Sequence, residues 1–234
     1  MDADGKVTGI TGGTATITVK ANGSDVYKDD ALEVTVTVNK ISAGISVEEI
    51  SFEIDVNANK TIIVNKGEFD GTITFESSNS SVAAVDGDGK VTGIIGGDAT
   101  ITVNATGSAK YNDESLEVTV KVNIISPNLD ADDVVVDVDA SESISIHVPR
   151  DYEGKITYEI GNSSIATVEN GIVKGIIGGN TTVKITINES AKYSDDSIEI
   201  NVTVNKILSN GITVVPDNLE IDVFDSKDFT VSDY

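Results

Sequence analysis

Apolar and polar residues alternate along most of this chain with a period of two. Ala15, Ile17 and Val19 share one side of a stretch in which threonines fill the positions between them. Successive side chains of a β-strand point to opposite faces, so this period predicts half-buried strands. The same alternation returns at Leu32, Val34, Val36 and Val38. We find no convincing helical periodicity with caps, so the pattern predicts an all-β protein.

Residues 41–123 show the pattern most completely. Turn signals such as Asp70-Gly71, Asp88-Gly89 and Gly96-Gly97 separate the apolar stretches. The expected strands cover 44–48, 50–56, 60–65, 71–77, 82–86, 90–95, 98–105 and 114–122. The first two are alternatively one strand broken by a bend. Short strands at this spacing predict a β-sandwich or barrel of about seven strands.

One glycine-containing stretch is written three times. Its copies begin at Asp4, Asp88 and Asn170, and each continues through a Gly-Gly pair into an alternating strand. Gly93 follows Gly9 by 84 residues, and Gly175 follows Gly93 by 82. A fixed period of this kind predicts repeated modules of about 83 residues. The glycines close turns and no helix follows them, so the stretch is not a phosphate-binding loop.

The repeat divides the chain into two complete modules and two partial ones. We expect complete modules at 41–123 and 124–206. Residues 1–40 match the C-terminal part of a module. Residues 207–234 match the N-terminal part of a further one, because Leu219-Glu220-Ile221-Asp222-Val223 resembles Phe52-Glu53-Ile54-Asp55-Val56. On this division the chain opens inside one module and closes inside another.

Composition narrows the classes of partner. The chain has 39 acidic and 16 basic residues, a formal charge of −23, and no cysteine. Nucleic acids and anionic membranes are disfavoured, because both need positive charge on the protein. No apolar run approaches the length of about 20 residues that spans a membrane, so we expect no membrane insertion in this segment. The start Met1-Asp2-Ala3-Asp4 is no signal peptide, so an export signal would lie outside the segment.

Candidate chemistry is sparse. His147 is the one histidine, and no nucleophile–base pair, phosphate loop or helix-borne metal motif occurs, so we do not expect an enzyme. In an up-and-down arrangement the loops 66–70, 86–89 and 106–114 fall at one end of a module. Hard oxygen ligands there predict a Ca²⁺ site at the junction between modules. Its candidate ligands are Glu68, Asp70, Asp86, Asp88, Asp113 and Glu114. The alternative is that these acids are turn chemistry and solvated charge.

Two further residue types recur in equivalent places. Tyr27, Tyr111 and Tyr193 each precede the last strand of a unit, which predicts a plug over the end of the sandwich with the hydroxyl bonded to backbone. Asn-x-Ser/Thr sequons are candidate glycosylation sites. The equivalent pairs among them are Asn79 with Asn162, and Asn22 with Asn188. The alternative is that a chain rich in threonine and asparagine makes sequons by chance.

The repeated motifs resemble the bacterial immunoglobulin-like (Ig-like) domain, group 2. The resemblance rests on Ser-Val-Ala-Ala-Val at 81–85, Asp-Gly-Lys-Val-Thr-Gly-Ile at 88–94 and Ala-Thr-Ile-Thr-Val at 99–103, with related copies elsewhere. Phe75 and Tyr158 stand where the family often has tryptophan, which changes core packing. The family implies tandem Ig-like β-sandwiches in an extended array, as in invasin- and intimin-type adhesins and adhesin-like surface proteins of bacteria and methanogenic archaea.

Function is therefore expected from architecture. The resemblance implies a stalk or spacer of a cell-surface adhesin or extracellular filament. The expected partners are neighbouring Ig-like modules of the same or an identical chain, with a host-cell or cell-surface ligand bound elsewhere. One alternative is a self-assembling fibre in which 207–234 and 1–40 of neighbouring chains complete one sandwich. Another is a carbohydrate-binding accessory module, which would need a cluster of exposed aromatic residues. Aromatic residues make up only 5% of the chain, and none is tryptophan.

Overall fold

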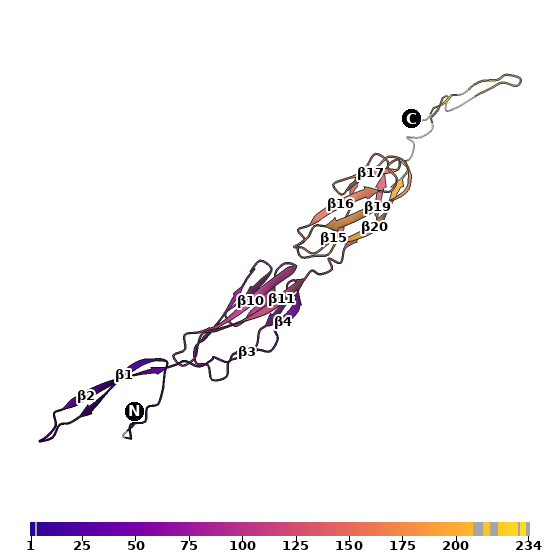
Figure 1. The fold of residues 1–234 in the computed structure, drawn as a ribbon. Helices are drawn as coiled ribbons and strands as arrows, with labels where there is room; N and C mark the ends of the chain where they lie inside the picture. Colours follow the sequence, from indigo (N-terminus) through magenta and orange to yellow (C-terminus); the bar gives the residue numbers. More distant parts are fainter. Residues whose placement is uncertain (3, 208–212, 216–219, 229, 233–234) are drawn as a thin grey trace. The chain divides into compact units, whose positions relative to one another are not determined.

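The structure is a computed structural model that describes residues 1–2, 4–207, 213–215, 220–228 and 230–232. All regular secondary structure among these residues is β-strand, and none of them lies in a helix (Figure 1). The predicted all-β class is confirmed. The chain divides into two compact units, Met1–Ile125 and Ser126–Tyr234. None of the described residues lies in a helix long and apolar enough to cross a membrane.

The first unit contains a complete two-sheet sandwich. One sheet has the strand order β4-β11-β10-β7, and the facing sheet has the order β5-β9-β8. The four strands of the larger sheet are β4 (Ser51–Asp55), β11 (Glu114–Asn123), β10 (Gly97–Thr106) and β7 (Thr72–Ser77). Those of the smaller sheet are β5 (Asn59–Thr61), β9 (Lys90–Gly93) and β8 (Ala83–Val85). These two sheets together hold seven strands, as expected.

The alternating residues of these strands form the core. Along β10, Ala99, Ile101, Val103 and Ala105 are buried while the residues between them are more exposed. Ala99, Ile101 and Val103 share one core cluster with Val118 and Val120 of β11 and Val91 of β9, and Ala105 belongs to a second cluster with Ala43, Ile45 and Phe69. The period of two therefore reflects one face of a sheet packed on its partner, as aligned sandwiches require.

The first and last strands of the larger sheet lie side by side. β4 pairs in parallel with β11, from Ser51 opposite Thr119 to Asp55 opposite Asn123. β3 (Ser46–Val47) is a separate strand that pairs with β6 (Val64–Asn65) in a two-stranded ribbon. The two earliest predicted strands are thus distinct elements of different sheets and not one bent strand.

The second unit repeats this topology. Its sheets have the orders β13-β20-β19-β16 and β14-β18-β17. The larger sheet contains β13 (Val134–Asp137), β20 (Asp196–Asn205), β19 (Gly179–Asn188) and β16 (Lys155–Ile160). The smaller contains β14 (Ser141–Ser143), β18 (Ile172–Gly175) and β17 (Ala166–Glu169). A ribbon joins β12 (Asp130–Ala131) to β15 (Ile146–His147), and His147 is exposed.

Two hairpins flank the complete sandwiches along the chain. β1 (Gly13–Ala21) pairs with β2 (Asp30–Val38), and β21 (Thr213–Val215) pairs with β22 (Thr230–Ser232). They fall in the segments 1–40 and 207–234 that were expected to be partial modules. Of the second segment, residues 208–212, 216–219, 229 and 233–234 lie outside the described residues.

Candidate functional site

The loop between β10 and β11 is organised by one buried serine. Ser108 is only 4% exposed. Its Oγ accepts hydrogen bonds from the amides of Lys110 and Tyr111, both at 3.0 Å, and donates to Asp70 Oδ1 at 2.6 Å. Serine favours such local bonds to backbone amides in turns. The loop is therefore fixed both to itself and to the start of β7.

The second module builds the same loop from equivalent residues. Ser190 Oγ accepts from the amides of Lys192 at 3.1 Å and Tyr193 at 3.0 Å, and donates to Glu153 Oε1 at 3.0 Å. Sequence reasoning identified the tyrosines but missed the serines. The signal was present in Ser108-Ala109-Lys110-Tyr111 and Ser190-Ala191-Lys192-Tyr193.

The repeated tyrosine closes the module end, though its hydroxyl does not bind where expected. Tyr193 is 4% exposed, and its hydroxyl donates to Asp151 Oδ1 at 2.6 Å, a carboxylate and not backbone. The hydroxyl that does reach backbone belongs to Tyr152, which donates to the carbonyl of Asn188 at 2.9 Å. In the first module Tyr111 lies edge-on to Phe69, with ring centroids 5.9 Å apart. In the second module the rings of Tyr152 and Tyr193 lie 6.0 Å apart, so the plug is a pair of aromatic rings in each complete module. The prediction is wrong for Tyr27, which is 77% exposed.

Asp151 is the electrostatic centre of this end of the second module. Lys192 Nζ lies 2.8 Å from Asp151 Oδ2. The hydrogen bonds from Lys192 and Tyr193 lower the pKa of Asp151 below its usual value. The bond to Asp151 and burial together raise the pKa of Tyr193 to about 12. The carboxylate therefore keeps its charge and Tyr193 its proton at neutral pH.

The link from the β1–β2 hairpin meets the first module at the loop between β10 and β11. Ile41 donates its amide to the carbonyl of Lys110 at 3.0 Å and accepts from the amide of Asn112 at 2.7 Å. Lys40 Nζ donates to the carbonyl of Ser108 at 2.7 Å. Gly12 donates its amide to the carbonyl of Ala109 at 2.8 Å. The link is thus held by hydrogen bonds to the loop that begins at Ser108, which we call the serine turn.

Four of the six predicted calcium ligands accept hydrogen bonds from other groups of the chain. Asp86 Oδ1 accepts from the amides of Asp88 and Lys90 at 3.0 and 2.9 Å. Asp113 Oδ1 accepts from Gly107 at 3.3 Å, and Glu114 Oε2 accepts from Gly44 at 3.0 Å. Asp70 binds Ser108 and lies 3.1 Å from Lys110 Nζ. Both Asp88 and Glu68 are exposed.

The described residues do not bring three or more acidic, histidine or cysteine side chains together in a group that could hold a metal ion. The hydrogen bonds of Asp86 and Asp113 within their own turns are those that the alternative interpretation, turn chemistry, expects. The Ca²⁺ site remains a prediction.

The sequons lie in different environments. Asn79 and Asn162 occupy exposed turns, where each Oδ1 accepts from the amide two residues later, at 3.1 and 3.0 Å. Asn22 is exposed at the end of β1. Asn188 ends β19, and its Oδ1 is buried without a hydrogen-bond partner. Of the four, Asn188 is the least accessible, and glycosylation at all four remains a prediction.

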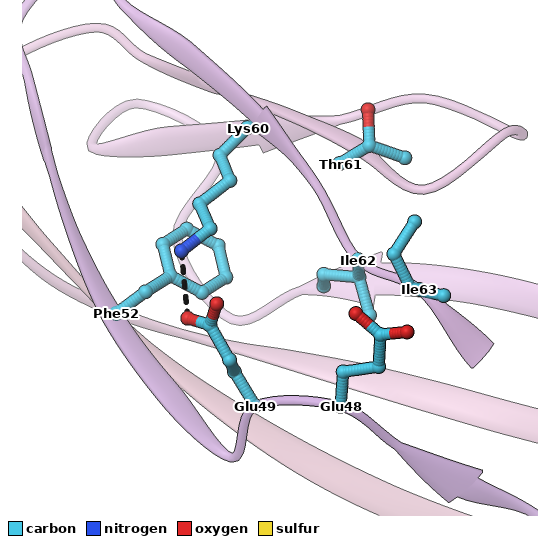
Figure 2. Close-up of a pocket in the computed structure, with 7 residues that line it drawn as sticks. All are labelled: Glu48, Glu49, Phe52, Lys60, Thr61, Ile62 and Ile63. Atoms are coloured by element: carbon cyan, nitrogen blue, oxygen red, sulfur yellow. Dashed lines mark hydrogen bonds and ion pairs between the residues drawn. The ribbon is translucent and has the colours of Figure 1, made fainter. Parts of the chain in front are cut away.

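A small pocket of about 110 Å³ lies beside β5 in the first module (Figure 2). It is lined by Glu48, Glu49, Phe52, Lys60, Thr61, Ile62 and Ile63. The Lys60 side chain extends into it, and its Nζ lies 2.6 Å from Glu49 Oε2 and 4.9 Å from the centroid of the Phe52 ring. A single ring already covered by a cation offers little stacking surface for a sugar, so this pocket does not favour the carbohydrate-binding alternative.

Both complete modules are two-sheet β-sandwiches with the same strand order. Residues 43–111 match the family model of the bacterial Ig-like domain (group 2), which confirms the resemblance for the first complete module. None of the curated proteins compared with the chain matches it.

Several solved structures are similar at low identity. The chain is 17% identical to surface layer protein SbsC, domains 1–6, with a TM-score of 0.37, and the match covers 92% of this chain and 38% of that one. It is 15% identical to Drosophila N-cadherin EC1–3, with a TM-score of 0.32, covering 83% and 78% of the two chains. An endo-fucoidan hydrolase of glycoside hydrolase family 107 is 11% identical, with a TM-score of 0.31, covering 84% and 34%. TM-scores this low support no inference about function.

Proposed function

We propose that this chain is a structural segment of an extracellular, cell-surface protein, in which Ig-like modules form the stalk or spacer of an adhesin or filament. The observation that carries the proposal is the repetition of one sandwich, strand for strand, in a chain whose family match is a bacterial Ig-like domain. Modules repeated in tandem supply length and spacing. On this proposal the ligand binds elsewhere in the surface protein.

The serine turn gives the proposal a physical basis. A spacer needs links that limit bending, and the link at Lys40 and Ile41 is tied to the turn by three hydrogen bonds of 2.7–3.0 Å. A flexible linker would instead be rich in glycine and serine and would bond mainly to water. Extension of the array would then follow from many short, restricted links.

Small-angle scattering tests the proposal. A compact globule of this length has a radius of gyration of about 17 Å, and a spacer should exceed this value clearly. The measurement is made at several protein concentrations, so that association between copies is not mistaken for elongation. A concentration-independent radius near that of a compact globule would refute the spacer.

A second measurement addresses location. Antibodies against the two complete modules should label intact cells that express the whole natural protein, and external protease should remove the label. Labelling only after the cells are permeabilised would contradict an extracellular location.

A further inference from the structure

The third copy of the repeated glycine stretch begins with asparagine, where the other two begin with aspartate. Asn170-Gly171 takes the place of Asp4-Gly5 and Asp88-Gly89. When glycine follows asparagine, the backbone amide of the glycine can approach the side-chain carbonyl closely, because glycine has no side chain in the way. Whether that amide reacts depends on its exposure and on its hydrogen bonds in the fold.

Asn170 and Gly171 form the turn of the β17–β18 hairpin. Glu169 pairs with Ile172 across this turn. Asn170 has a φ of 50° and Gly171 a φ of 78°, the left-handed conformations that a tight hairpin needs and that asparagine and glycine tolerate. The Asn170 side chain is exposed, and a groove of about 270 Å³ is lined by Asn170 and Ile172 among others. Water therefore reaches the side-chain amide.

The amide of Gly171 has no hydrogen-bond acceptor in the described part of the chain. At the equivalent turn of the first module, the amide of Gly89 donates to the carbonyl of Asp86 at 3.1 Å. In the β1–β2 hairpin, which contains the Asn22-Gly23 pair, the amide of Gly23 donates to Asp29 Oδ1 at 2.5 Å. The backbone nitrogen is thus available at Gly171 and engaged at both of the compared glycines.

We propose that Asn170 is a site of spontaneous deamidation, in which the backbone nitrogen of Gly171 is the nucleophile. This nitrogen gives its proton to a base in the solvent and attacks Cγ of Asn170. A bond from the nitrogen to Cγ forms and closes a succinimide ring. The bond from Cγ to the side-chain nitrogen breaks, and that nitrogen takes up a proton and leaves as ammonia. One water then opens the ring at either carbonyl, which leaves aspartate or isoaspartate at position 170.

The two products differ in what they do to the hairpin. Aspartate gives the Asp-Gly pair that the other two copies carry, and it tolerates the left-handed conformation as asparagine does. Isoaspartate continues the chain through its side-chain carboxyl carbon, which adds a backbone atom to a turn whose register is fixed by Glu169 and Ile172. The carbonyl of Gly171 accepts the amide of Ile144, next to β14, at 2.8 Å. Isoaspartate therefore disturbs all three strands of this smaller sheet.

The reacting groups lie within the second complete module. The first module carries Asp88 at the equivalent position, which has no side-chain amide to lose as ammonia. Age would therefore change one module of the chain and leave its neighbour as it was made. This inference goes beyond the spacer function and does not depend on it, because a chain with another role would undergo the same reaction.

Mass spectrometry of the 234-residue chain tests the proposal. The folded protein is kept at mildly alkaline pH, sampled over days and digested, and the peptides with Asn22 and Asn170 are read separately. Conversion is scored from the mass change of amide to carboxylic acid, and electron-transfer fragmentation separates isoaspartate from aspartate. We expect both products at position 170. Conversion at Asn22 should be slower by roughly tenfold or more, because its glycine amide must first give up a hydrogen bond to a charged group.

Asp88→Asn is the matched control, since it places the same Asn-Gly pair in a turn whose glycine amide is bound. Its conversion should be about two- to tenfold slower than that of Asn170. Asp29→Ala releases the amide of Gly23 and should speed conversion at Asn22. The thermal transitions of the two complete modules report that each variant is folded. Conversion at Asn170 no faster than in the Asp88→Asn turn would overturn the proposal, as would aspartate formed there without isoaspartate.

Discussion

Val103 and Val19 occupy equivalent positions of the repeat but differ in burial. Replacing each by alanine therefore measures how much burial contributes to stability when the strand position is the same. Val103 in β10 is fully buried, and Val19 in β1 is 53% exposed. The substitution removes two methylene equivalents, worth about 0.8 kcal/mol each. In the closed core a cavity remains, which brings the cost of Val103→Ala to about 2 to 3 kcal/mol. At Val19 solvent already reaches the side chain, so we expect less than about 0.5 kcal/mol.

Calorimetry of dilute protein measures this difference. The two complete modules have separate cores, so each should give its own transition. For a module of this size a loss of 1 kcal/mol lowers Tm by about 4 to 8 °C. Val103→Ala should therefore lower one transition by roughly 10 °C or more, while Val19→Ala leaves both in place. Similar shifts for the two variants, or a shift of both transitions by Val103→Ala, would refute the reasoning.

Four further predictions concern the module ends and the close contacts. Ser108→Ala leaves the amides of Lys110 and Tyr111 without their acceptor and should cost about 1 to 3 kcal/mol by urea denaturation, whereas Ser24→Ala, in the exposed hairpin, should be neutral. Gly175→Ala places a Cβ 2.6 Å from the carbonyl oxygen of Asp137 and should cost about 1 to 3 kcal/mol; Gly87→Ala, with open space around it, is the control, and equal losses would contradict the contact. The pKa of Asp151 is lowered on folding, so its contribution to folding stability is present above the unfolded pKa of about 3.9 and is lost as pH falls through the lower folded value. Asp151→Asn should therefore flatten the fall in Tm of the second module between pH 6 and 3, and an unchanged profile would count against this role. The pKa of Tyr193 is raised to about 12, so its contribution to folding stability is complete below the unfolded pKa of about 10 and is lost as pH rises through about 12. The difference in alkaline absorbance between the natural chain and Tyr193→Phe should show this titration, and a midpoint near 10 would disprove it.

The sequence predicted the positions of strands better than it predicted which strands pair with each other. Residues 98–105 were expected as a strand, and β10 covers Gly97–Thr106. Its alternation identified the buried side because only one face of that sheet meets the other sheet. The parallel pairing of β4 with β11 was not predicted, because a period of two is the same for every strand whichever partner it has.

The hydrogen-bond partners of the candidate residues were harder to infer than the strands, for a physical reason. Turn acids such as Asp86 have backbone amides within reach, and these local bonds compete with any shared cation. The partner of Tyr193 could not be inferred, because Asp151 lies 42 residues earlier in the chain and reaches it only through the fold. A motif shared by all three repeats, by contrast, was a dependable guide to position. The turn amides of Tyr27, Tyr111 and Tyr193 all bind a serine Oγ three residues before.

The parallel contact between the first and last strands of each larger sheet decides how a module bears mechanical load. β4 and β11 run in the same direction, and so do β13 and β20. A pull on the two ends of a module therefore draws these strands in opposite directions along their length. The load falls on all the hydrogen bonds of the pair together, whereas an antiparallel hairpin pulled from its open end would lose its bonds in succession. Each module is thus loaded in shear, the geometry in which a β-sheet resists extension most strongly.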